Sequence, residues 1–178
     1  MHFIVFLNHR DLSTTQLGTI GLTSCHVAEP SMTALSSIVV GQLGTGEQLL
    51  LWALRQRRAD RGETTPALVK GFVLACGLAG VEPALAQFER LSDALERPRH
   101  CGLCPLRCAV LSTDEARCLS LLACAQAGEL HGTSRLASEL VGADGAPDLC
   151  ATARQLASVL DRAGYRLSAP GPSAAVLH

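Results

Sequence analysis

Residues 112–128 read STDEARCLSLLACAQAG, a stretch with a start signal and a stop signal for an α-helix. Ser112 followed three residues later by Glu115 has the spacing of a capping box, in which each side chain bonds the backbone amide of the other residue. Gly128 is the residue type that most often follows the last turn of a helix. The stretch therefore predicts a helix that ends near residue 127.

Similar signals occur upstream of this stretch. Thr45 and Gln48 have capping-box spacing and predict a helix over residues 46–61. Thr65 before Pro66 predicts a second helix start, which Gly77 ends. The apolar stripe of that second helix consists of Leu68, Val69, Phe72, Val73 and Cys76.

Three further helices are expected, one before the opening stretch and two after it. One begins at Pro83 and is closed by Pro98, a short one covers residues 134–141, and the last begins at Asp148 and ends at Gly164. No apolar–polar alternation of period two follows residue 45. We therefore predict an all-α fold: a compact bundle of five or six short helices with a cysteine-rich loop between helices.

Length and composition fit one domain with loose ends. The chain has 178 residues, of which 48% are apolar, so a core can form without help from a metal or disulfides. Residues 1–31 carry three of the six histidines and no helical period, and we interpret them as a flexible or misassigned extension. Residues 32–167 are the predicted helical domain, and residues 168–178 are a predicted disordered tail.

The charge balance argues against a nucleic-acid partner. The net charge is −1, which creates no field that would attract nucleic acid or an anionic membrane. Arg55, Arg57, Arg58 and Arg61 form a basic run, which we interpret as a solvated helix face. We expect the partner to be another protein.

No export or membrane signal is recognised, so the expected compartment is a reducing cytoplasm. No window approaches eighteen uninterrupted apolar residues, and the first residues lack a basic n-region. In such a compartment eight cysteines indicate thiols or metal ligands in preference to disulfides. A single lysine against fourteen arginines is typical of a GC-rich bacterial genome.

The main chemical signal is the stretch HCGLCPLRCAVLSTDEARC at residues 100–118. Cys101, Cys104 and Cys108 fall in the predicted loop, where short side chains can converge on one point. A C-x2-C step lets two thiolates share a tetrahedral ion, Cys108 is a third ligand, and Cys118 supplies the fourth if the loop folds back on it. We therefore predict a metal site of Cys101, Cys104, Cys108 and Cys118.

Other donors were weighed for this site. His100 is an alternative fourth ligand, although it adjoins Cys101, and Cys150 remains open as a distant one. Cys76 and Cys124 are expected to be packing residues. The segment CGLCPLRC resembles the leading cysteines of radical-SAM activase-type proteins and of molybdopterin oxidoreductases. The further cysteines of both families are absent, so this short resemblance implies cysteine-rich coordination and no family.

These observations predict a bacterial zinc-clamped helical protein that acts as a binding or regulatory module. An iron–sulfur redox or metal-sensing protein is the alternative, because clusters use the same thiolate ligands. A helical domain with thiols and no metal is the second alternative. No catalytic motif occurs, and a nucleophile built from Cys101 and His131 has no evident orienting group, so an enzyme is not expected.

Overall fold

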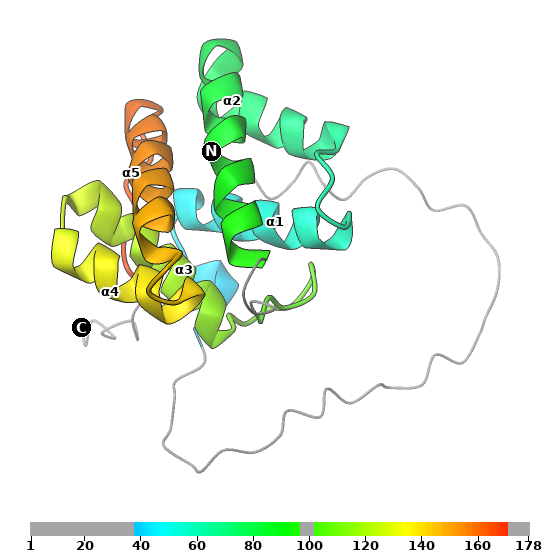
Figure 1. Cartoon of the computed structure of the whole chain (residues 1–178). Helices are drawn as coiled ribbons and strands as arrows, with labels where there is room; N and C mark the ends of the chain where they lie inside the picture. Colours follow the sequence, from blue (N-terminus) through cyan, green and yellow to red (C-terminus); the bar gives the residue numbers. More distant parts are fainter. Residues whose placement is uncertain (1–37, 97–101, 171–178) are drawn as a thin grey trace, which may run out of the picture. The chain divides into compact units, whose positions relative to one another are not determined.

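The computed structural model describes residues 38–96 and 102–170 (Figure 1). The chain divides into a unit of residues 1–35 and a unit of residues 36–178, and the described residues all belong to the second. These residues form no strand, so the predicted all-α class is confirmed for them. Their elements are η2 (Val40–Gln42), α1 (Thr45–Ala59), α2 (Pro66–Glu96), α3 (Thr113–Ala127), α4 (Leu130–Val141) and α5 (Ala146–Arg162).

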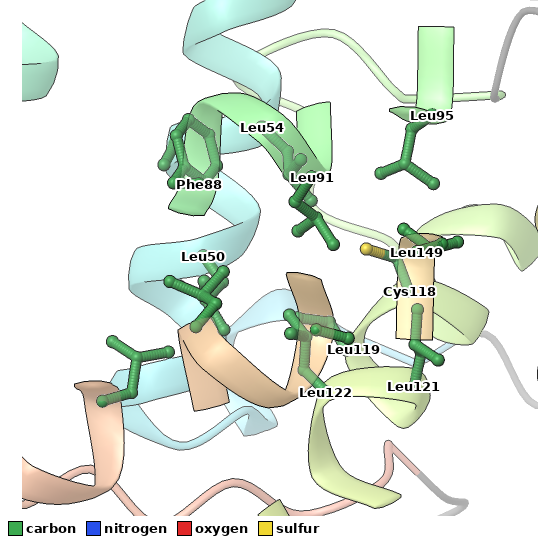
Figure 2. Close-up of a cluster of buried hydrophobic side chains, with 14 of the residues drawn as sticks. Leu50, Leu54, Phe88, Leu91, Leu95, Cys118, Leu119, Leu121, Leu122 and Leu149 are labelled. Carbon is green, nitrogen blue, oxygen red and sulfur yellow. The ribbon is translucent and has the colours of Figure 1, made fainter. Parts of the chain in front are cut away.

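The core lies where α5 packs against α2, α3 and α4, while α1 packs against α2 and α3. Figure 2 shows leucine side chains of four helices converging on this region. Phe72 and Phe88 of α2 are both fully buried, and their ring centroids lie 5.2 Å apart. The largest other side chains in the core are Leu50, Leu54, Leu68, Leu91, Leu119, Leu121, Leu122, Leu149 and Leu156.

Helix α3 has the termini that the sequence predicts. The hydroxyl of Ser112 accepts a hydrogen bond from the Glu115 amide at 3.1 Å, and the Glu115 carboxylate accepts one from the Ser112 amide at 2.8 Å. Gly128 follows the last turn with φ 76° and ψ 15°, a left-handed conformation that favours glycine. The capping box and the glycine stop are confirmed.

Helix α2 contains the two helices that the sequence predicts, which meet at a break at Gly77, but the second begins earlier than predicted. The backbone does break at Gly77, whose φ of 72° and ψ of 172° lie in a region open essentially to glycine alone. The chain is helical again from residue 78, so the second predicted helix start, at Pro83, is wrong. Proline has no amide proton to donate to the preceding turn. The helix nevertheless continues through Pro83, which lies inside it and not at its start.

Both parts of α2 contribute buried side chains to the core, Leu68 and Phe72 among them before Gly77, and the break between the two parts is exposed. The part after Gly77 buries Phe88, Leu91 and Leu95, whereas Leu74 and Leu78, on either side of the break, are 62% and 82% exposed. In the described part of the chain, α2 is also the one helix long and apolar enough to cross a membrane, judged by length and composition alone. The helix contains no uninterrupted apolar run of that length, because polar and charged residues interrupt its sequence.

Three other helix starts differ from their predictions. Gly44, and not Thr45, is the residue that precedes α1. The side-chain amide of Gln48 donates to the Leu43 carbonyl, so no capping box forms there. Helix α4 begins four residues before the predicted start at residue 134. Gly145 precedes α5, and Asp148 lies within its first turn, where the helix dipole stabilises a carboxylate.

The segment after α5 is attached to the helices. The side-chain amide of Gln126 donates to the Tyr165 carbonyl at 2.8 Å and accepts from the Leu167 amide at 2.7 Å. The Ser168 amide donates to Glu47 at 2.6 Å. Ser168 is the first residue of the predicted tail, and residues 171–178 lie outside the described residues. The predicted boundaries at residues 31 and 167 stay predictions.

Candidate functional site

The candidate site is the segment of residues 102–112, here called the cysteine loop, which leads into α3. It places Cys104 and Cys108, both half-buried, on either side of a turn whose tip is Pro105, Leu106 and Arg107. The Cys108 amide closes that turn by donating to the Pro105 carbonyl at 2.9 Å. All three tip residues are exposed, so the loop presents its tip to solvent, whereas the two cysteines are partly covered.

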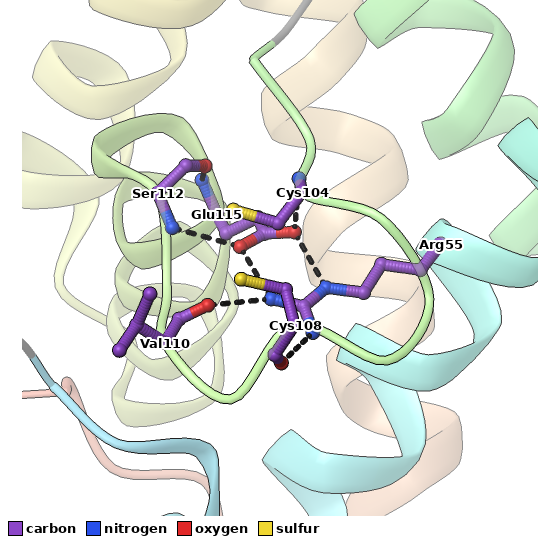
Figure 3. Close-up of polar contacts among 6 residues, drawn as sticks. All are labelled: Arg55, Cys104, Cys108, Val110, Ser112 and Glu115. Atoms are coloured by element: carbon purple, nitrogen blue, oxygen red, sulfur yellow. Dashed lines mark hydrogen bonds and ion pairs between the residues drawn. The ribbon is translucent and has the colours of Figure 1, made fainter. Parts of the chain in front are cut away.

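A buried ion pair lies beneath the loop (Figure 3). The Nε of Arg55 on α1 lies 2.7 Å from Oε1 of Glu115 on α3, and the two side chains are 2% and 0% exposed. A second hydrogen bond joins Nη2 of Arg55 to Oε2 of Glu115 at 2.9 Å. This bidentate geometry is the strongest form of the arginine–carboxylate pair.

The same pair binds the loop backbone. Arg55 donates to the carbonyl oxygens of Cys108 at 2.7 Å and Val110 at 2.8 Å. Glu115 accepts from the amides of Cys104 at 2.9 Å and Ser112 at 2.8 Å. Four backbone groups of the loop are therefore satisfied by two charged side chains, which offsets part of the cost of burying those charges.

The two ends of the loop are held by other contacts. The Gly102 amide donates to the Asp114 carboxylate at 2.8 Å. The residues before α1 pair with the far end, through an amide–carbonyl bond from Val40 to Ala109 at 2.8 Å and another from Leu111 to Ile38 at 3.1 Å. The cysteine loop thus has a defined backbone along its described length.

The structure corrects the prediction that the basic run is a solvated face. Arg55 and Arg57 are 3% and 6% exposed, and only the other two arginines of the run lie on the surface. Arg57 joins α1 to α2 through an ion pair with Asp93 at 2.6 Å. It also donates to the hydroxyl of Thr64, which lies in the connection before α2, at 3.3 Å. These two arginines hold helices together, which solvated side chains would not do.

Electrostatics at the site follow from this burial. Burial alone would raise the pKa of Glu115, but hydrogen bonds from Arg55 and from the amides of Ser112 and Cys104 outweigh it, so the pKa is lowered. Burial, the nearby Glu115 charge and a hydrogen bond with Cys108 raise the pKa of the Cys104 thiol to about 11. At neutral pH Glu115 is a carboxylate and Cys104 is a thiol.

The structure brings together two of the four predicted metal ligands, Cys104 and Cys108. Cys118 is fully buried in the core beside Leu149 and Leu121 (Figure 2). Cys101 and His100 lie outside the described residues. Within residues 38–96 and 102–170, no group of three or more possible metal ligands is found. The four-cysteine site stays a prediction.

Of the other described cysteines, Cys76 lies on α2, Cys124 on α3 and Cys150 on α5. Cys76 and Cys124 are half-buried against the hydrophobic core, and burial raises the pKa of both thiols. Cys150 is buried in α5, where its thiol lies 3.6 Å from the carbonyl of Thr133. His131 is exposed on α4. The sequence pattern did not predict that Arg55 belongs to the site. It predicted Glu115 as part of the capping box but not as the partner of Arg55 and of the Cys104 amide.

The described residues form five α-helices and a loop whose two thiols lie beside a buried ion pair. Comparisons of this chain with protein-family models, curated protein sequences and solved structures found no match.

The raised pKa of Cys104 predicts how its reactivity depends on pH. A thiol with a pKa near 11 exposes its reactive thiolate only in strong alkali, so alkylation of Cys104 by iodoacetamide should accelerate about tenfold per pH unit from pH ~7 to ~10. An ordinary cysteine levels off above pH ~8.5. Mass spectrometry of the modified peptides measures the rate. A plateau for Cys104 near pH ~8.5 would contradict the environment described above.

Proposed function

We propose that the cysteine loop is a zinc clamp and that the protein is a binding or regulatory module for another protein. The observation that carries the proposal is the side-by-side placement of the Cys104 and Cys108 thiols on a loop with a fixed backbone. Structural zinc sites use such thiolates, held by surrounding hydrogen bonds that orient them. Cys101 adjoins Gly102, which is anchored to α3, and is the third proposed ligand.

Cys118 is kept as the proposed fourth ligand, and it is the position that discriminates best. Cys118 lies on α3, the helix that follows the loop, and is fully buried. An iron–sulfur cluster on the same thiolates is the alternative proposal. A cytoplasmic location and a protein partner follow from the sequence arguments, and the exposed loop tip around Leu106 offers that partner a contact surface.

Zinc content of the purified full-length protein tests this function. We expect about one zinc per chain by elemental analysis, and loss of that zinc in the Cys101→Ser, Cys104→Ser and Cys108→Ser variants, because removing a thiolate opens a closed tetrahedral site. Circular dichroism should show that the helices remain, since the buried core cluster consists of helix residues and only Leu103 and Leu111 of the loop pack against it. Cys104 is protonated at neutral pH, so zinc binding should also release protons.

Cys76→Ser and Cys124→Ser are the matched controls and should retain full metal content. Retention of zinc by Cys118→Ser would place the fourth ligand elsewhere. A visible absorption band with bound iron would replace the zinc clamp by a cluster. If the wild-type protein holds no metal, or if all loop variants bind as much as the wild type, the zinc function is wrong.

A further inference from the structure

The Cys104 and Cys108 thiols are partners of each other as well as proposed metal ligands. They point to the same side of the loop in Figure 3, and Cys108 lies close enough to Cys104 to raise the pKa of its thiol. The turn between them is closed by the bond from the Cys108 amide to the Pro105 carbonyl. Two neighbouring thiols that point to the same side of a closed turn need little backbone movement to form a disulfide.

The buried ion pair determines the separation of the two cysteines. Glu115 holds the Cys104 amide at 2.9 Å, and Arg55 holds the Cys108 carbonyl at 2.7 Å. Because Arg55 and Glu115 are bonded to each other, the backbones of both cysteines are attached to one rigid unit. Such an attachment keeps each thiol at a high effective concentration relative to the other.

We propose that Cys104 and Cys108 form a reversible intramolecular disulfide by exchange with a low-molecular-weight disulfide such as oxidised glutathione. One cysteine sulfur attacks a glutathione sulfur, forms a mixed disulfide and releases one glutathione thiolate. The other cysteine then attacks the protein sulfur of that mixed disulfide and releases the second glutathione. The two cysteines lose two electrons and two protons. These electrons and protons are taken up by the two glutathione molecules, which leave in the reduced form.

This inference depends on the thiol pair and not on bound zinc. A disulfide uses the same sulfur atoms that the clamp would use, so oxidation and zinc binding exclude each other. The exchange should be slow at neutral pH, because the attacking species is a thiolate and the Cys104 thiol lies near the Glu115 carboxylate. The amount of disulfide at equilibrium does not depend on the rate of this exchange.

The test uses the metal-free full chain in glutathione redox buffers that contain a chelator, followed by acid quenching and mass spectrometry. Trypsin cuts after Arg107, which places Cys104 and Cys108 on separate peptides, residues 100–107 and 108–117. We expect these peptides to become linked as oxidised glutathione increases. Cys101 shares a peptide with Cys104, so the Cys101→Ser variant is the decisive control and should retain the link, whereas Cys104→Ser and Cys108→Ser should lose it.

A link that disappears in Cys101→Ser, or peptides that stay unlinked at equilibrium with excess oxidised glutathione, would overturn the proposal. The zinc function is judged separately by metal content, so either can fail alone. Arg55→Lys tests the role of the ion pair, since lysine keeps the charge and loses the fork that holds Cys108. We expect its dithiol–disulfide equilibrium to shift about tenfold toward the dithiol. If Arg55→Lys does not fold, Glu115→Gln is measured instead, and an unchanged equilibrium in the folded variant would show that the ion pair does not set the spacing.

Discussion

Replacing Arg55 with methionine is expected to lower the free energy of unfolding by about 3–5 kcal/mol, which is the cost of leaving a buried charge without its partner. Methionine fills much of the same volume, so the loss comes from charge and hydrogen bonding more than from packing. Glu115 would keep its two amide donors and lose the guanidinium, at a side-chain exposure of 0%. Urea unfolding followed by circular dichroism measures the change.

Two further variants separate the causes of this loss. Arg154→Met, on the exposed face of α5, should change the free energy of unfolding by less than about 0.5 kcal/mol. The double variant Arg55→Met with Glu115→Leu removes both charges and should recover only part of the loss, because the amides of Cys104 and Ser112 then have no acceptor. A loss of less than about 1 kcal/mol for Arg55→Met would mean that the ion pair is not buried in solution.

Phe88→Ala is expected to lower the free energy of unfolding by about 3–5 kcal/mol. The ring is fully buried between α2 and the other core helices and lies 5.2 Å from the Phe72 ring. Its removal leaves a cavity that the close-packed core around it fills only in part. Thermal and urea unfolding of the purified variant provide the measurement.

Leu78→Ala is the matched control in the same helix. Leu78 is 82% exposed and lies directly after the break at Gly77, so its truncation should change stability by less than about 0.5 kcal/mol. A large effect at Leu78 would show that the surface around the break is covered in solution. Equal, small effects at both positions would contradict the placement of Phe88 in the core.

The sequence predicts the helices where start and stop signals are local. The capping box of Ser112 and Glu115 and the glycine at 128 define both ends of α3 within one short window. Thr45 and Gln48 have the same spacing without the same outcome, because Gly44 takes the position before the helix and Gln48 bonds Leu43 instead. Spacing alone does not report which backbone groups compete for a side chain.

The ion pair was missed because a run of charges was interpreted without its helical position. Arg55 lies four residues after Leu51, and Glu115 lies four residues before Leu119, so each occupies an apolar face by helical spacing. That signal was present in the sequence. The pairing itself joins residues 60 positions apart, and no local pattern predicts which buried base meets which buried acid.

The contacts of the cysteine loop also bear on the order in which the protein folds. Helices α3, α4 and α5 follow one another directly and pack together, so their contacts are short in sequence and can form early. The loop instead depends on Arg55, 60 residues before Glu115, and on the bond from Leu111 back to Ile38. Closing such long loops is entropically costly, which delays these contacts. The thiol pair is therefore assembled after the helices around it, as a product of folding and not as its nucleus.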